Sequence, residues 1–207
     1  MKYTLISDGS SDRALMPILS WALRQSRIRS PLSAQWADFR HLRCPPRGLL
    51  NRLVEAVHLY PCDLLFVHRD AEAGSPDDRL DEIESAISQL SDAPAWVPVV
   101  PVRMLEAWFL RDENAIRKAA GNPGGAMALD LPVLAQIERV PDPKAVLRRA
   151  ILVASGLNRR RQKNVRAGYV LHRIAELCDD FSTLNDLPAF ARFMTELSRV
   201  VAEHNFR

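Results

Sequence analysis

Short apolar segments alternate with amphipathic helical segments through the first half of this 207-residue chain. The clearest is DLLFVH at 63–68, whose continuous apolar centre is typical of a strand buried on both faces of a parallel sheet. The other expected elements are strands at 2–7, 34–42 and 96–102 and helices at 12–25, 47–59 and 76–90. This alternation predicts an α/β fold with right-handed crossovers and a mainly parallel sheet that has helices on both faces.

The apolar pattern changes in the second half of the chain. A helix is expected at 104–119, and a Gly-rich turn follows at 121–125. From 144 to 204 the apolar residues recur at helical spacing, with no strand of comparable strength. We therefore expect a Rossmann-like α/β domain at 1–120 and a helical C-terminal extension at 121–207 that packs on it.

Several classes of protein are disfavoured by the same sequence. No run approaches the roughly 18 apolar residues of a membrane span, and the N-terminus has no leader-like segment, so we expect a cytoplasmic protein without a membrane partner. The three cysteines have no paired spacing, so neither a disulfide framework nor a zinc site is supported.

The charged residues are distributed unevenly, although the net charge is only +3. Between Arg139 and Arg173 there are ten basic residues and one acidic residue, whereas between Asp63 and Asp92 there are nine acidic residues and two arginines. The basic segment is typical of a phosphate-binding surface. The alternative is a solvated helix face whose arginines pair with the acidic segment.

Acidic residues follow three of the expected strands. Asp8 and Asp12 follow the first, Asp70 and Glu72 the third, and Glu106 lies just beyond the fourth. Ligands of open α/β sheets bind at the carboxyl ends of the strands, and clustered carboxylates suit Mg²⁺ or Mn²⁺. Individually, each acid also has a structural interpretation, as a turn or cap residue, a solvated loop acid or a helix-surface carboxylate.

Five segments of the chain resemble a known family. LISDGSSDRALMPIL is similar to the first motif of Toprim domains, a strand followed by Glu-Gly and an Asp, and LLFVHRDAE resembles the second, a strand ending in Asp-x-Asp. PVRMLEAWFLRD, PDPKAVLRRAI and DLPAFARFMTEL resemble later segments of an uncharacterised bacterial Toprim-like family related to OLD and RloB proteins. The resemblance covers most of the chain and implies a Toprim-like fold with a Mg²⁺-dependent phosphoryl-transfer site.

Two positions depart from the Toprim pattern. Asp8 stands where the first motif has Glu, and Glu72 stands where the second motif has its second Asp. Either the exchange of side-chain lengths preserves the reach of the two carboxylates, or the site is no longer catalytic.

These observations lead to a hypothesis of a metal-dependent phosphodiesterase or nuclease acting on DNA or RNA. The expected catalytic residues are Asp8 and Glu106, and the expected ligands of Mg²⁺ or Mn²⁺ are Asp8, Asp12, Asp70 and Glu72. The expected phosphate-binding residues are Arg103, Lys144, Arg159, Arg160, Arg161 and Lys163, with Lys144 taken from the family resemblance.

The alternative hypothesis is a non-catalytic subunit with the same fold. Such a subunit would bind nucleic acid or a protein, with a partner encoded in the same operon, as in a phage-defence system. Binding without hydrolysis, unaffected by a chelator, would favour it.

Overall fold

The computed structural model describes residues 1–206, apart from the side chain at position 167. Its centre is a four-stranded sheet with the order β2-β1-β3-β4, in which every neighbouring pair is parallel. The strands are β1 (Lys2–Ile6), β2 (Ser33–Trp36), β3 (Leu64–His68) and β4 (Ala95–Val99). The predicted α/β fold with a parallel sheet is confirmed.

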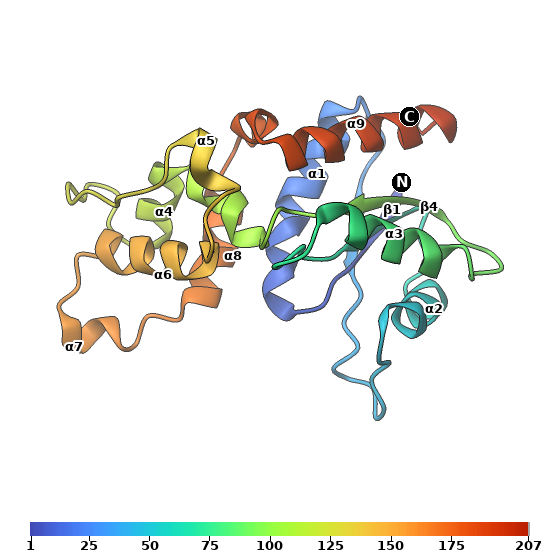
Figure 1. The fold of residues 1–207 in the computed structure, drawn as a ribbon, viewed down its shortest axis with the longest axis horizontal. Coiled ribbons are helices and arrows are strands. Elements are labelled where there is room, and N and C mark those ends of the chain that lie inside the picture. The colour runs from blue at the N-terminus through green and yellow to red at the C-terminus, as the bar shows by residue number, and fades with distance from the viewer. Residues whose placement is uncertain (207) are drawn as a thin grey trace.

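Helices cover both faces of the sheet, as predicted (Figure 1). One face packs against α1 (Leu15–Gln25) and α9 (Pro188–Glu203), and the other against α2 (Leu49–Leu59) and α3 (Pro76–Ile87). Side chains alternate along a strand, so neighbours such as Leu65 and Phe66 of β3 enter different cores. This arrangement explains why the LLFV run of β3 has no polar residue.

Several elements begin or end up to three residues from the predicted bounds, and two differ more strongly. β2 ends at Trp36 instead of 42, because the Asp38 carboxylate accepts hydrogen bonds from the backbone and side chain of Arg40 and forms a local turn. The expected helix at 104–119 is a 3₁₀ helix, η2 (Leu105–Arg111), followed by α4 (Glu113–Ala119). Asp112 separates them and caps α4 through the N–H of Ala115.

The remaining helices form a second lobe, on the left of Figure 1. It contains α5 (Leu134–Ile137), α6 (Pro143–Ala154), α7 (Arg159–Gln162) and α8 (Ala167–Leu177), and η3 (Ser182–Asp186) leads back towards the sheet. Packing crosses the expected boundary at 120, because η2 and α4 lie against α6 and α8, whereas α9 returns to the sheet. No helix in residues 1–206 is long and apolar enough to cross a membrane.

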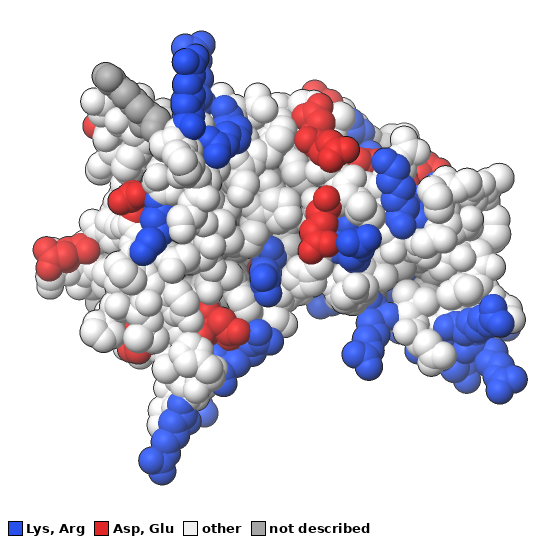
Figure 2. Space-filling model, turned by 180° about the vertical axis from the view of Figure 1, so that it is seen from behind, with Lys and Arg blue, Asp and Glu red and all other residues white. Residues whose placement is uncertain are grey.

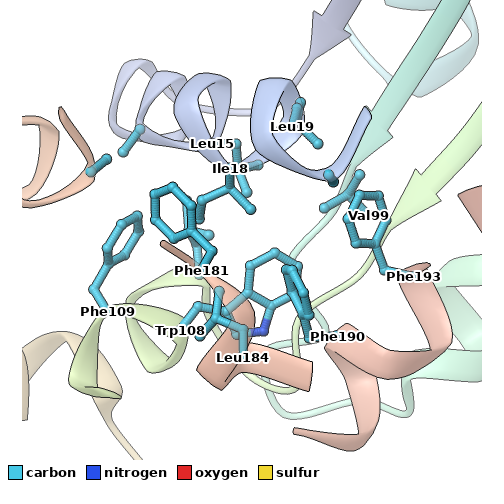
Figure 3. Packing of buried hydrophobic residues seen from close by; sticks show 14 of the residues in the cluster. Leu15, Ile18, Leu19, Val99, Trp108, Phe109, Phe181, Leu184, Phe190 and Phe193 are labelled. Carbon is cyan, nitrogen blue, oxygen red and sulfur yellow. The ribbon is translucent and has the colours of Figure 1, made fainter. Parts of the chain in front are cut away.

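An aromatic cluster joins the two lobes (Figure 3). Trp108 of η2 lies edge-to-face against Phe190 of α9, with ring centroids 5.0 Å apart, and close to Phe193. Phe193 in turn packs against Phe66 of β3, so that one continuous core runs from the sheet into the helical lobe. This core fixes the position of the carboxyl edge of the sheet relative to the helices that face it.

Candidate active site

The strand order places a topological switch point, here called the crevice, at one edge of the sheet. The chain leaves β1 towards β2 on one side and leaves β3 towards β4 on the other, so the two central strands diverge at their carboxyl ends. Ligands of doubly wound sheets bind at such a switch point. Asp8 follows β1 here and Asp70 follows β3, which places both at the same edge.

A buried histidine lies next to this switch point, at the end of β3. His68 ends β3 and is 2% exposed, and its Nδ1 forms a hydrogen bond of 2.9 Å with the carbonyl oxygen of Val99. Because a carbonyl oxygen only accepts hydrogen bonds, Nδ1 carries a proton. The other ring nitrogen, Nε2, lies 3.5 Å from Asp70 Oδ1 and 3.9 Å from Asp12 Oδ2. Nε2 therefore faces two carboxylates, one on each of two neighbouring segments.

Asp70 is held in a mostly buried position. Its Oδ1 accepts the backbone N–H of Leu105 at 2.9 Å. Burial raises the pKa of Asp70 to about 6, and the charges of Asp12 and Glu106 act in the same direction, against His68 and the Leu105 hydrogen bond. A carboxyl group with this pKa exchanges its proton near neutral pH, as a general acid or base must.

Asp12 and Glu106 complete the cluster. Asp12 is 8% exposed, and its carboxylate accepts the Gly9 N–H at 2.8 Å and the Ser11 hydroxyl at 3.0 Å. Asp12 therefore stabilises the turn, as one interpretation of the sequence suggested, and it also lies close to His68. Glu106, also 8% exposed, approaches only a distant cation, with Oε1 4.0 Å from Lys144 Nζ. Three carboxylates and one histidine are thus concentrated at the crevice.

The other two expected metal ligands face arginines instead. Asp8 binds Arg52 at 2.6 Å and Arg69 at 2.9 Å. Glu72 has an exposed side chain and lies 3.6 Å from Arg79. These cations neutralise the carboxylates that the Toprim pattern would direct at a metal.

No three His, Cys, Asp or Glu side chains within residues 1–206 are arranged so that they could hold a metal ion. The expected ligands Asp8, Asp12, Asp70 and Glu72 are thus not gathered into such a group in the described structure, and of the two expected catalytic acids Glu106 lies in the cluster, whereas Asp8 lies against arginines. Oxygen donors of the right kind are present, but Asp8 and Glu72 would have to leave their arginines to act as ligands.

A basic pocket opens beside the cluster. Its volume is about 630 Å³, and Glu106 and Lys144 line it together with Arg148 and Arg149 of α6. Lys144 is exposed and thus accessible to an anion; its phosphate-binding role stays a prediction. Arg103 lies at the same edge of the sheet, where its carbonyl accepts the N–H of Glu72 at 2.7 Å.

The remaining phosphate-binding candidates lie away from the crevice. Arg159, Arg160 and Arg161 form most of α7, and Lys163 follows it; all four side chains are exposed. Seen from behind, basic side chains gather on two projections at the lower edge of the molecule, the α7 segment and the loop 37–48 (Figure 2). Within the described chain these α7 residues form no ion pair with the acidic segment at 63–92, where Asp77 pairs instead with Arg192 of α9.

The sequence analysis missed several residues of the site. His68 ends an apolar strand and is indistinguishable by pattern from a core residue, although its place two residues before Asp70 was a usable signal. Arg52 and Arg69, which bind Asp8, lie 44 and 61 residues away from it in the chain. No local motif connects such distant residues.

Fold and site together define an α/β protein with an all-parallel sheet and an acid–histidine cluster at its switch point. Comparison with protein-family models, curated proteins and solved structures finds no match to this chain.

If the basic segment binds nucleic acid, as the sequence leads us to expect, simultaneous Arg159→Glu, Arg160→Glu and Arg161→Glu substitutions should weaken that binding and flatten its salt dependence. A protein that makes fewer phosphate contacts releases fewer counterions when it binds. The magnitude of the slope of log K against log salt should therefore fall by roughly 2–3 when three contacts are lost. Filter binding at several salt concentrations measures this slope. Unchanged binding would show that α7 is only a solvated surface.

The matched control is a second triple variant, with the same three Arg→Glu changes made outside α7. Arg29, between α1 and β2, and Arg192 and Arg199 of α9 are exposed arginines outside the basic segment, and the two arginines of α9 already pair with acids. Their combined change to Glu should leave the salt slope close to that of the unaltered protein. An equal effect of both triple variants would indicate a response to net charge alone.

Proposed function

We propose that the chain hydrolyses phosphodiester bonds of nucleic acid at the cluster of Asp12, His68, Asp70 and Glu106. The observation that carries this proposal is the Asp70 carboxyl, whose pKa is raised to about 6 beside a buried histidine at the switch point of the sheet. The adjoining pocket with Lys144 supplies cations where the phosphates of a substrate would lie.

The roles of the residues follow from their chemistry. Asp70 accepts a proton from the attacking water as the new P–O bond forms, and His68 keeps the carboxylate oriented through Nε2. The bond to the leaving oxygen breaks, and that oxygen takes up a proton from solvent. Lys144 and Arg148 bind the non-bridging and neighbouring phosphate oxygens. Burial keeps the pKa of Asp70 high, and the charges of Asp12 and Glu106 add to this effect.

A second candidate function is supported by a separate surface, the groove between α3, β4 and α9. This groove has a volume of about 690 Å³, with Leu80, Trp96 and Phe193 among its apolar residues and Asp81 and Glu84 among its acids. A groove of this kind fits a segment of another protein. It favours the alternative of a binding subunit, as in a phage-defence assembly, in which the crevice does no chemistry.

Purified protein incubated with labelled single- and double-stranded DNA and RNA distinguishes the two functions. Parallel reactions contain Mg²⁺, Mn²⁺ or EDTA. Cleavage of any substrate in any of these buffers supports the proposed phosphodiesterase, and its loss in EDTA would show that a divalent ion takes part. Binding of the same probes without cleavage in every buffer would instead establish the binding subunit.

A further inference from the structure

A second pocket lies beside the crevice, on the β2 side of the sheet. Its volume is about 390 Å³, and it is enclosed by the carboxyl ends of β1 and β2, the loop 37–48 and the start of α2. Asp8 lines it and also binds Arg69, the residue before Asp70, so this pocket and the crevice share a wall. The proposed function assigns no role to it.

Aromatic rings are held in place in this pocket. The half-buried Trp36 donates its indole N–H to the Ser7 hydroxyl at 3.0 Å, which fixes the orientation of the ring. The Arg40 guanidinium already lies over this ring, 5.1 Å from its centroid. Phe39 is 6% exposed and lies beneath Arg52 at 5.8 Å. A fixed ring that accepts a planar group on its face is a platform for a nucleobase.

The charges of the pocket leave one cation without a partner. Arg52 pairs with Asp8 and Arg40 pairs with Asp38, each at 2.6 Å. Arg47 lines the same pocket, is exposed, and has no ion pair within the described chain. Three arginines against two aspartates give the pocket a net positive charge.

Backbone donors reinforce this charge next to Arg47. Gly48 has a φ of 75° and directly precedes α2, an 11-residue helix whose N-terminus has no side-chain cap. The first N–H groups of a helix without such a cap can donate to an anion. The unpaired Arg47 side chain and these donors thus line the same end of the pocket.

We propose that this pocket binds one nucleotide of a single-stranded nucleic acid. The base stacks on Trp36 in place of the Arg40 guanidinium, and the phosphate binds Arg47 and the start of α2. A base in a duplex is stacked on both sides and cannot enter such a pocket, so the pocket selects single strands. This assignment rests on the proposed function, because the shared Asp8 wall would place the next phosphodiester beside Asp70.

Fluorescence anisotropy with a fluorescein-labelled oligothymidylate of about 12 nucleotides, in EDTA, tests the proposal by binding alone. Arg47→Ala and Trp36→Ala are each expected to weaken binding about 10-fold, whereas Trp36→Phe keeps a ring and should bind nearly as the unaltered protein does. Thymidine monophosphate should displace the oligonucleotide only at much higher concentration if a strand is the ligand. Displacement at equal concentration would assign the pocket to free nucleotides and overturn the single-strand proposal.

The matched control is Arg43→Ala, an exposed arginine of the same loop that does not line the pocket. Equal weakening by Arg43→Ala and Arg47→Ala would show diffuse attraction by the loop and overturn the proposal. A duplex of the same length binding as tightly would overturn it as well. If the unaltered protein binds as described but never cleaves, the proposed function is refuted and this pocket assignment stands.

Discussion

Asp70→Asn is expected to lower the cleavage rate by about 100-fold or more, because the variant has no carboxylate to accept the proton of the attacking water. Asparagine retains Oδ1, so the hydrogen bond from Leu105 can persist. Initial rates on the substrate found to be cleaved measure the effect. The control is Asp92→Asn, an exposed aspartate in the turn before β4, which should leave the rate unchanged.

The same substitution is expected to stabilise the fold above pH 6. The Asp70 carboxyl has a pKa of 3.8 in the unfolded chain and about 6 in the folded protein. Between these values the folded protein holds a proton that the unfolded chain has released, so the free energy of unfolding decreases as the pH rises. The loss of stability caused by the ionised Asp70 carboxylate reaches its full size above pH 6 and amounts to about 2–3 kcal/mol.

Urea denaturation at pH 8 and pH 4 tests this expectation. Asp70→Asn should raise the free energy of unfolding by about 2–3 kcal/mol at pH 8 and change it little at pH 4, where Asp70 is already protonated in the fold. Lower activity combined with higher stability is typical of a group retained for function. A variant that is less stable than the unaltered protein at pH 8 would contradict the raised pKa.

Glu72→Gln separates the proposed cluster from the Toprim-like metal site. In the structure Glu72 approaches Arg79 and lies outside the acid–histidine cluster, so its loss should affect cleavage less than the loss of Asp70. If Glu72→Gln abolishes cleavage as completely as Asp70→Asn, the carboxylates must rearrange around a metal during the reaction. That result would support the ligand set expected from the sequence.

The sheet could be predicted because each strand carries its own signal. The LLFV run of β3 is buried on both faces, and its neighbours in the sheet also alternate with amphipathic helices. β2 was predicted too long because the turn at Asp38 depends on one side-chain contact to Arg40, which hydrophobic patterning does not detect.

The site was predictable only in part, for a related reason. Asp12, Asp70 and Glu106 gather as expected, because the carboxyl ends of parallel strands meet at one edge. Asp8 and Glu72 lie at that edge too, but distant arginines determine what they face. Glu72 also adopts a left-handed backbone, with a φ of 54°, which a pattern of residue types does not indicate.

Trp108→Ala is expected to destabilise the protein by about 3–5 kcal/mol, the usual range for truncating a buried aromatic residue. The side chain is 2% exposed and packs between Phe190 and Phe193, which come from the helix that returns to the sheet. Its removal would leave a cavity where the two lobes meet. Urea denaturation at pH 7 measures the change.

Trp108→Phe is the matched control for this cavity. The indole N–H of Trp108 is buried without a hydrogen-bond partner in the described structure, so phenylalanine removes an unsatisfied donor and keeps a ring. Its effect should stay below about 1.5 kcal/mol. Because one core runs through both lobes, each variant should unfold in a single transition. Two transitions in Trp108→Ala, with the sheet outlasting the helical lobe, would show that the lobes fold independently.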